Sequence, residues 1–487
     1  MKQLGNALGK LNRGKKTAVI VLWATTAIAL PAQTFTTLFI FDHTHGALPY
    51  SGLVQAANGD LYGTTVEGGA GAGEGTVFKI TPSGTLTTLH TFDGADGLEP
   101  YAGLVQAANG EFYGATPVGG ANNNGTVFKM TPSGALTTLY SFCSQSGCAD
   151  GSEPYAVPVQ AANGDFYGTT TYGGANGNYG TIFKMTPSGT LTTLYSFCSQ
   201  SGCTDGYYPY AGLVQATNGD LYGTTYGCGP LVSGRPCGGN YGTIFKMTPS
   251  GTLTTLYSFC SQSGCTDGAY YAGLVQAING DLYGTTTYGG ANGNYGTIFK
   301  ITPRGTLTTL YSFCSQSGCT DGEAPYARLV QATNGEFYGT AYLGGANGYG
   351  AIFEIAPSGA LTTLHSFDLM DGAYPDAALV QDTDGTFYGT TYGGSSGGVG
   401  VVFSLSVGLG PFVETEPTSG KVGVAVKVLG TNLTGATSVT FSGTAAVFKV
   451  VSSSEITTNV PAGATTGAVQ VVAPGGTLSS NVPFRVP

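Results

Sequence analysis

Apolar and polar residues alternate along most of the chain in short runs, which is the period-2 pattern of half-buried β-strands. One such stretch, LVQAANGDLYG at Leu53–Gly63, recurs with small changes. Its further copies begin at Leu104, Pro158, Leu213, Leu274, Leu329 and Leu379. A pattern that returns seven times at intervals of 50 to 61 residues predicts seven repeated structural units.

Each unit divides into four predicted strands. The first reads YAGLVQA and ends at an Asn-Gly pair such as Asn58-Gly59, the strongest signal for a tight hairpin turn. The second reads DLYGTTTY and runs into a glycine-rich loop, the third reads GTIFKMT, and PSG turns the chain into the fourth, TLTTLYSF. Four antiparallel strands repeated about every 50 residues are typical of a β-propeller blade.

The two ends of the repeat region complement each other. The seventh unit stops at GVVFSLSVG, residues 400–408, and lacks a fourth strand. The segment TFTTLFIFD at Thr34–Asp42 reads as a fourth strand with no unit before it. We therefore expect an all-β protein in which residues 33–407 form a seven-bladed β-propeller of four-stranded blades, with the ring closed by the N-terminal strand.

After the repeats the pattern changes to alternating strands with Pro and Gly turns, which predicts an immunoglobulin-like β-sandwich over residues 411–487. The stretches EPTSGKVGVAVKVLGTNLTGATSVTF, ITTNVPAGATTGAVQVV and GGTLSSNVPFRV carry a resemblance of this module to IPT/TIG domains. That resemblance implies a spacer or an interaction module.

The repeats themselves resemble a second known family. GLVQAANGDLYGTT, GGANGNYGTIFKMTPSGTLTTLYSF and their copies are similar to the GloVer, or choice-of-anchor, tandem repeats of exported bacterial proteins. The resemblance covers about three quarters of the chain. It implies export and a varied C-terminal anchor, and it carries no established activity.

The N-terminus predicts export as well. Residues 1–32 read as a Sec-type signal peptide, with an apolar stretch at Thr17–Leu30 and small residues for cleavage near Ala29 or Ala32. Its basic residues are Lys2, Lys10, Arg13, Lys15 and Lys16. We expect a secreted or cell-surface protein with no transmembrane segment after cleavage; an uncleaved anchor is the alternative reading.

Charge narrows the range of partners. The chain has 17 basic and 27 acidic residues, and removal of residues 1–32 leaves 12 basic residues and a net charge of −15. Nucleic acid is therefore excluded as a partner, because its phosphates require a basic surface. With 41% hydrophobic and only 9% charged residues, the composition also argues against disorder.

Eight of the ten cysteines occur in four copies of CSQSGC followed by Ala or Thr and then Asp-Gly. In a propeller these loops share one face with the glycine-rich loops, opposite the tight turns. Export favours oxidation, so we expect local disulfides. The predicted pairs are Cys143–Cys148, Cys198–Cys203, Cys228–Cys237, Cys260–Cys265 and Cys314–Cys319. A zinc site is the competing interpretation, but the spacing lacks the usual C-x2-C pattern.

The best candidate site is a ring of side chains at the start of the first strands, expected at the channel mouth on the loop face. Its members are Tyr50, Tyr101, Tyr155, Tyr210, Tyr271, Tyr326 and Asp376. Aromatic rings with a polar tip suit sugars or peptides at a wet surface, while packing between blades is the alternative role. We assign no catalytic residue, no metal ligand and no cofactor.

Three functions fit these features. The first is a non-catalytic binding protein for a glycan or an envelope protein, which uses the disulfide-stiffened loop face. The second is a polysaccharide hydrolase or lyase at the channel mouth, for which Asp376 would be the leading carboxylate. The third is a structural protein of the cell envelope. The sequence assigns no oligomeric state.

Overall fold

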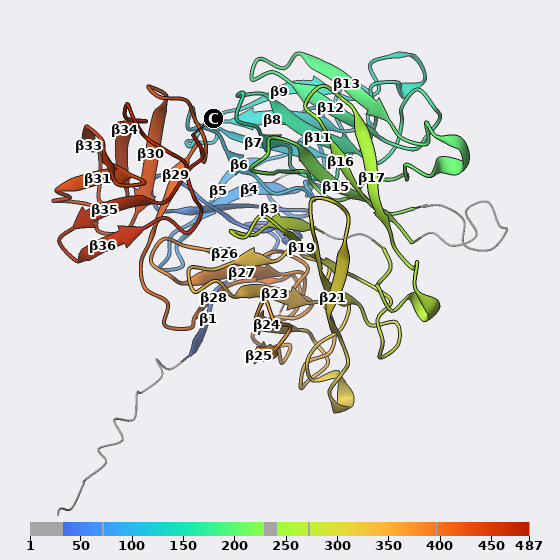
Figure 1. The fold of residues 1–487 in the computed structure, drawn as a ribbon. Helices are drawn as coiled ribbons and strands as arrows, with labels where there is room; N and C mark the ends of the chain where they lie inside the picture. Colours follow the sequence, from blue (N-terminus) through green and yellow to red (C-terminus); the bar gives the residue numbers. More distant parts are fainter. Residues whose placement is uncertain (1–32, 71–72, 228–240, 271–272, 396, 487) are drawn as a thin grey trace, which may run out of the picture.

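The computed structural model describes residues 33–70, 73–227, 241–270, 273–395 and 397–486. In this part of the chain, strands form nine four-stranded antiparallel sheets, of which seven belong to the repeats and two to the C-terminal module (Figure 1). Four short 3-10 helices complete the regular structure, namely η1 (Ser146–Cys148), η2 (Ser201–Cys203), η3 (Ser263–Cys265) and η4 (Ser317–Cys319).

Each repeat folds into one sheet with strands in chain order. The third repeat gives β10 (Val159–Gln160), β11 (Phe166–Thr170), β12 (Thr181–Met185) and β13 (Leu191–Ser196). All five residues of the second strand are buried in every repeat sheet. The fourth strand of each full repeat is half-buried except for one exposed threonine near its start.

The remaining full repeats follow the same plan. Their strands are β2 (Val54–Gln55), β3 (Leu61–Thr65), β4 (Thr76–Ile80), β5 (Leu86–Thr91); β6 (Val105–Gln106), β7 (Phe112–Thr116), β8 (Thr126–Met130), β9 (Leu136–Ser141); β14 (Val214–Gln215), β15 (Leu221–Thr225), β16 (Thr243–Met247), β17 (Leu253–Ser258); β18 (Leu274–Gln276), β19 (Leu282–Thr286), β20 (Thr297–Ile301), β21 (Leu307–Ser312); and β22 (Val330–Gln331), β23 (Phe337–Ala341), β24 (Ala351–Ile355), β25 (Leu361–Ser366).

The first strand is much shorter than the sequence predicts. Only two or three residues of each YAGLVQA segment pair with the second strand. The residues before them lie against the equivalent segment of the neighbouring repeat instead. A Cβ built on Gly103, for example, would lie 3.1 Å from the carbonyl oxygen of Gly52. These segments, which we call the inner segments, therefore line up side by side without a hydrogen-bonded ladder between them.

The seventh sheet is assembled from both ends of the repeat region. It contains β26 (Val380–Gln381), β27 (Phe387–Thr391), β28 (Val401–Ser406) and the N-terminal β1 (Thr34–Ile40). β1 runs antiparallel to β28, with Thr34 opposite Ser406 and Ile40 opposite Val401. The N-terminal segment thus supplies the missing fourth strand, as its sequence predicts.

Neighbouring repeat sheets are joined by apolar cores and by one recurring hydrogen bond. Tyr113 of the second repeat stacks on Phe166 of the third at a centroid distance of 4.0 Å. The inner-segment glutamines accept from the Asn-Gly turn of the preceding repeat, as in Ala57 N to Gln106 Oε1 at 2.9 Å. The same bond joins the seventh repeat to the first, because Thr383 N donates to Gln55 Oε1 at 3.1 Å.

The C-terminal module is a two-sheet sandwich. One sheet has the order β29 (Val413–Glu416), β30 (Ala425–Gly430), β34 (Glu455–Asn459), β33 (Phe448–Val450). The other has the order β32 (Thr444–Ala445), β31 (Ser438–Phe441), β35 (Val469–Ala473), β36 (Gly476–Ser479). Val428, Phe441, Ile456, Val469 and Phe484 lie in the core between them.

The module sits on the side of the tight turns, at the left of Figure 1. Ser454 Oγ donates to the carbonyl of Ala57 at 2.9 Å, and Phe412 N donates to the carbonyl of Thr383 at 2.9 Å. The long loops of the repeats are on the opposite side, away from the module.

Candidate functional site: the loop face of the repeats

The loop face is built where two kinds of loop meet. The segment that follows each fourth strand pairs with the end of the next second strand, as in the bridge between Ser152 and Tyr172. Every repeat has such a bridge, from Ala47 with Glu67 to Ala373 with Gly393. Each inner segment therefore begins from a fixed point on this face.

The entrance to each inner segment holds a residue in the left-handed backbone region. These residues have φ between 51° and 65°, and they are Leu48, Glu99, Glu153, Tyr208, Tyr270, Ala324 and Tyr374. Such a conformation is uncommon for residues other than glycine and must be held by its surroundings. Glu153 shows how: its N–H donates to Asn124 O and its carbonyl accepts from Thr171 N, at 2.9 and 3.0 Å. The entrance is thus a rigid frame.

Four of the predicted tyrosines form a continuous row on this frame. Ring centroids are 4.9 Å apart for Tyr50–Tyr101, 5.5 Å for Tyr101–Tyr155 and 5.0 Å for Tyr155–Tyr210. We call these four residues the tyrosine row. Tyr326 contacts Tyr342 at 5.2 Å. The predicted member Tyr271 lies outside the described residues.

The sequence analysis missed a second set of tyrosines that extends the row. Tyr226, at the end of a second strand, lies 6.1 Å from Tyr210 and 4.8 Å from Tyr270. Tyr392 lies 4.9 Å from Tyr50 at the other end. The signal was present in the recurring TTY at the ends of the second strands, but only the folded loops bring those rings to the mouth.

Burial keeps the hydroxyl groups of the tyrosine row protonated. Desolvation is the largest cause that raises the pKa of Tyr50 and Tyr155 above the ordinary value. Both rings are only partly covered. Their hydroxyl groups are therefore neutral throughout the physiological range and can both donate and accept hydrogen bonds.

Asp376 takes the place of a tyrosine in the seventh repeat. Burial alone raises the pKa of Asp376 to about 7, with no contribution from another carboxylate of the described residues. A glycosidase needs two carboxyl groups about 5 to 10 Å apart. In the described part of the chain, Asp376 lacks the neighbouring charge that such a partner would provide.

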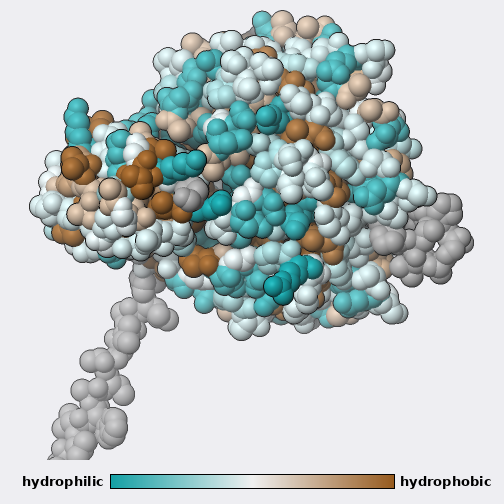
Figure 2. All heavy atoms as spheres, turned by 45° about the horizontal axis from the view of Figure 1, so that its top comes forward, coloured by the Kyte–Doolittle hydropathy of each residue, from teal (hydrophilic) through white to brown (hydrophobic). Residues whose placement is uncertain are grey.

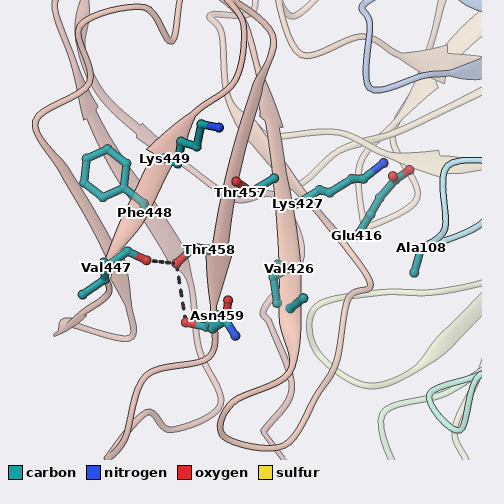
Figure 3. Close-up of a pocket in the computed structure, with 11 residues that line it drawn as sticks. Ala108, Glu416, Val426, Lys427, Val447, Phe448, Lys449, Thr457, Thr458 and Asn459 are labelled. Carbon is teal, nitrogen blue, oxygen red and sulfur yellow. Dashed lines mark hydrogen bonds between the residues drawn. The ribbon is translucent and has the colours of Figure 1, made fainter.

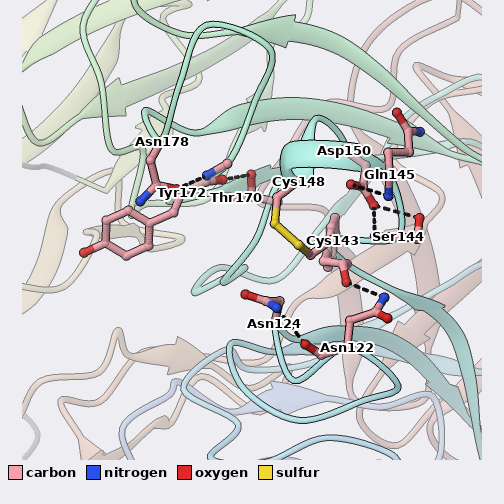
Figure 4. Close-up of a disulfide and its surroundings, with 12 residues drawn as sticks. Asn122, Asn124, Cys143, Ser144, Gln145, Cys148, Asp150, Thr170, Tyr172 and Asn178 are labelled. Carbon is pink, nitrogen blue, oxygen red and sulfur yellow. Dashed lines mark hydrogen bonds between the residues drawn. A yellow bond between two sulfur atoms is a disulfide. The ribbon is translucent and has the colours of Figure 1, made fainter.

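Each of the four CSQSGC loops is closed by a disulfide between its own two cysteines; Figure 4 shows one of them. The pairs are Cys143–Cys148, Cys198–Cys203, Cys260–Cys265 and Cys314–Cys319, with Cα–Cα distances of 4.0 to 4.1 Å. The predicted pair Cys228–Cys237 lies outside the described residues. A backbone hydrogen bond holds the first of these loops against the next repeat: Gly174 N donates to Cys148 O at 2.9 Å.

A buried aspartate organises each disulfide loop. Asp150 is fully buried and accepts from Tyr140 Oη at 2.8 Å, Ser144 N at 2.9 Å and Gln145 N at 3.2 Å. Asp205, Asp267 and Asp321 have the same environment. The sequence analysis did not single out these aspartates, although each follows its second cysteine at a constant spacing.

Two of the three loops without cysteines use histidine in place of that tyrosine. His90 Nε2 lies 2.6 Å from Asp96, and His365 Nε2 lies 2.8 Å from Asp371. Burial lowers the pKa of His365, against the opposing effect of Asp371. These histidines are therefore parts of the loops rather than free surface groups. Among the described residues, no three His, Cys, Asp or Glu side chains are grouped to hold a metal ion.

A second feature is a pocket of about 410 Å³ between the C-terminal module and the second repeat (Figure 3). It is lined by Ala108 and by module residues that include Glu416, Lys427 and Lys449. Burial raises the pKa of Glu416 to about 8, and nearby Lys427 opposes the shift. In Figure 3 the Lys427 side chain extends toward Glu416, so the pocket belongs to the contact between the two parts.

Exposed apolar side chains occur on the repeats, among them Ile278 and Met370, and on the C-terminal module (Figure 2). Val447 is 94% exposed, and Val422 and Val451 are each 53% exposed. Within the described residues, no helix combines the length and the apolar character needed to cross a membrane.

Fold and loops together define an all-β repeat protein with an immunoglobulin-like module. A family model described as the Gloeobacter/Verrucomicrobia repeat matches residues 24–235, 147–320 and 231–446, and the IPT/TIG domain model matches residues 413–486. The chain belongs to the Gloeobacter/Verrucomicrobia repeat family and ends in a TIG domain. None of the curated proteins matches it.

Several solved structures share part of this architecture. A putative 6-phosphogluconolactonase from Bacteroides uniformis is 15% identical and covers 68% of this chain and 89% of its own, with a TM-score of 0.44. PorZ of Porphyromonas gingivalis, a surface component of the type-IX secretion system, is 15% identical with a TM-score of 0.47. The match spans 92% of this chain and 60% of PorZ. At these values the likeness says nothing about activity.

Proposed function

We propose that the repeats form a closed seven-bladed β-propeller, and that this protein binds a glycan outside the cytoplasm without turning it over. The ring is supported by the hydrogen bond from the seventh repeat to Gln55 and by the shared core of the first and seventh sheets. Export is supported by the four disulfides, which persist in oxidising compartments.

The observation that carries the binding function is the tyrosine row. Its four rings lie edge by edge on a rigid frame, with neutral hydroxyl groups and partly exposed faces. Aromatic faces of this kind pack on the apolar faces of sugar rings, while the hydroxyl groups exchange hydrogen bonds with them. A frame that does not move on binding loses little entropy.

The test is a glycan array probed with residues 33–487, followed by calorimetry on each hit. Tyr101→Ala and Tyr155→Ala should each weaken binding about five-fold, since one stacked ring contributes about 1 kcal/mol. Tyr295→Ala is the matched control, because Tyr295 is exposed on a glycine-rich loop outside the row. Absence of any glycan ligand, or equal losses in all three variants, would sink the proposal.

The same samples decide against a hydrolase. Each bound polysaccharide is incubated with the protein, and new reducing ends are measured. The proposal expects none. Turnover that disappears in Asp376→Asn would replace the binding function with catalysis at the mouth.

A further inference from the structure

Small residues dominate the position where the inner segments approach one another. The third residue of each segment is Gly52, Gly103, Val157, Gly212, Gly273, Arg328 or Ala378. A Cβ on Gly52 would lie 2.9 Å from Ala378 O, and one on Gly212 would lie 3.5 Å from Val157 O. The seven positions therefore line the space enclosed by the inner segments, and only the sixth carries a long, charged side chain.

Arg328 is unpaired in this enclosed space. Among the described residues it has neither a hydrogen bond nor an ion pair with another side chain or backbone atom. Its side chain is accessible to solvent, yet it lies so deep in the protein that desolvation lowers the pKa of its guanidinium. The guanidinium is thus surrounded by protein and still open to solvent.

Several other cations of the repeats are paired with carboxylates. Lys79, Lys129, Lys184 and Lys246 of the third strands lie 3.1 to 3.9 Å from carboxylates of the turns in their own repeats. Asp376, whose burial raises its pKa to about 7, makes no ion pair with Arg328 in the described structure. The guanidinium is therefore available to an anion from outside.

We propose that Arg328 binds the carboxylate of a uronic acid, so that the ligand of the tyrosine row is an acidic polysaccharide. This inference rests on the proposed glycan-binding function. Arg328 follows Tyr326 of the mouth by two residues, which span at most about 7 Å of chain. A glycan that extends from the tyrosine row to Tyr326 thus has its next sugar within reach of the guanidinium.

The chemistry of arginine favours this ligand. The planar guanidinium presents two parallel N–H donors that match the two oxygens of a carboxylate. The low dielectric of an enclosed site strengthens such a pair, and an unpaired buried charge gains more from a partner than a surface charge does. A neutral sugar offers no equivalent group.

The experiment uses residues 33–487 labelled with 15N-arginine. Residues 33–487 contain four arginines, Arg235, Arg304, Arg328 and Arg485, so the side-chain Nε–Hε spectrum has four signals. The signal absent from Arg328→Gln identifies Arg328. The probes are trigalacturonate and trimannuronate, each with its methyl ester as the neutral match, and acetate at equal concentration.

We expect at least one free acid to shift the Arg328 signal and to bind at least ten-fold more tightly than its methyl ester. Arg328→Gln should lower the affinity of the acid to that of the ester while the melting temperature stays within a few degrees. Arg328→Lys should recover only part of the loss, because an ammonium cannot pair with both oxygens.

Other outcomes overturn the inference. If the acid and its ester bind equally and Tyr155→Ala weakens both, glycan binding stands and the role of Arg328 falls. An Arg328 signal that acetate moves as far as the oligosaccharides do would mean an unspecific anion site. If no sugar binds but a hexaglutamate peptide shifts the signal, the ligand is an acidic peptide, and both proposals for a glycan fail.

Discussion

Two arcs of the loop face make the same connection in different ways. Four consecutive connections carry a disulfide and are ten residues long from Phe to Gly, at 142–151, 197–206, 259–268 and 313–322. The other three, at 41–46, 92–97 and 367–372, have six residues and no cysteine. Both kinds begin at a buried phenylalanine and end at a glycine with positive φ that packs against the end of the next second strand. The residue there is a threonine in six repeats, and Ala341 takes its place opposite Gly322.

The difference lies in what holds the aspartate near the end of each loop. In the disulfide arc a tyrosine hydroxyl and two backbone N–H groups donate to an aspartate with no exposed surface. In the short arc, at Asp96 and Asp371, the partners are a histidine and one backbone N–H, and the aspartate is partly exposed. The comparison teaches that one fold can place a redox-sensitive and a pH-sensitive loop side by side on one face.

The largest difference in stability between the two arcs is expected when the aspartate is removed from one loop of each. Asp205→Ala leaves Ser199 N, Gln200 N and the Tyr195 hydroxyl without their acceptor in a buried site, so the free energy of unfolding should fall by about 3 kcal/mol. Asp96→Ala loses a partly exposed ion pair and should lower it by about 1 kcal/mol.

Urea unfolding followed by circular dichroism measures both variants, since the only tryptophan, Trp23, lies within residues 1–32. Equal losses in the two arcs would show that the buried aspartate of the disulfide loops is no more important than its exposed counterpart.

A smaller effect is expected from the disulfides. The double change Cys198→Ser and Cys203→Ser opens a six-residue loop, which on the chain-entropy model lowers stability by about 2 kcal/mol at most. The effect should be local, because Asp205 keeps its donors. Hydrogen exchange measured by mass spectrometry should rise in residues 197–206 and stay unchanged in 92–97. Faster exchange throughout the repeats would contradict this expectation.

The smallest effect concerns pH. Burial lowers the pKa of His365, so the unfolded chain takes up a proton near pH 6.5 before the folded loop does, and stability falls as the pH drops below that value. His365→Tyr should abolish the dependence, which is expected to stay below about 1 kcal/mol. The readout is hydrogen exchange in residues 367–372 at pH 7.5 and 5.0, corrected for intrinsic rates.

The reciprocal change sharpens the same comparison. Tyr195→His should give the loop at 197–206 a pH dependence that the native tyrosine lacks between pH 5 and 7.5. The histidines do not distinguish the two arcs if His365→Tyr keeps the pH dependence of hydrogen exchange and Tyr195→His does not acquire it.

Much of this fold could be predicted from the sequence because its signals are local and repeated. The Asn-Gly turns, the PSG turns and the cysteine spacing define hairpins and loops within a few residues. Even the role of Thr34–Ile40 was readable, since its pattern matches a fourth strand.

The site was harder to predict, because it depends on residues that break the repeat. Tyr226 and Tyr392 reach the mouth only through the course of the folded loops. Arg328 stands where the other copies have small residues, and its meaning appears only when the inner segments are seen to lie side by side. The length of the first strands was overestimated for the same reason, since those residues face a neighbouring repeat rather than their own sheet.

The seventh sheet has a consequence for how the chain is made. β1 is synthesised before all the repeats, yet its partner β28 belongs to the last repeat. During that interval β1 is an unpaired edge that carries Phe35 and Phe39, a segment open to aggregation or to capture by a chaperone. Such long-range pairing folds slowly. The native sheet thus cannot form until the last repeat has emerged. A prematurely terminated product would keep β1 as an exposed, unpaired strand that quality-control proteases can recognise.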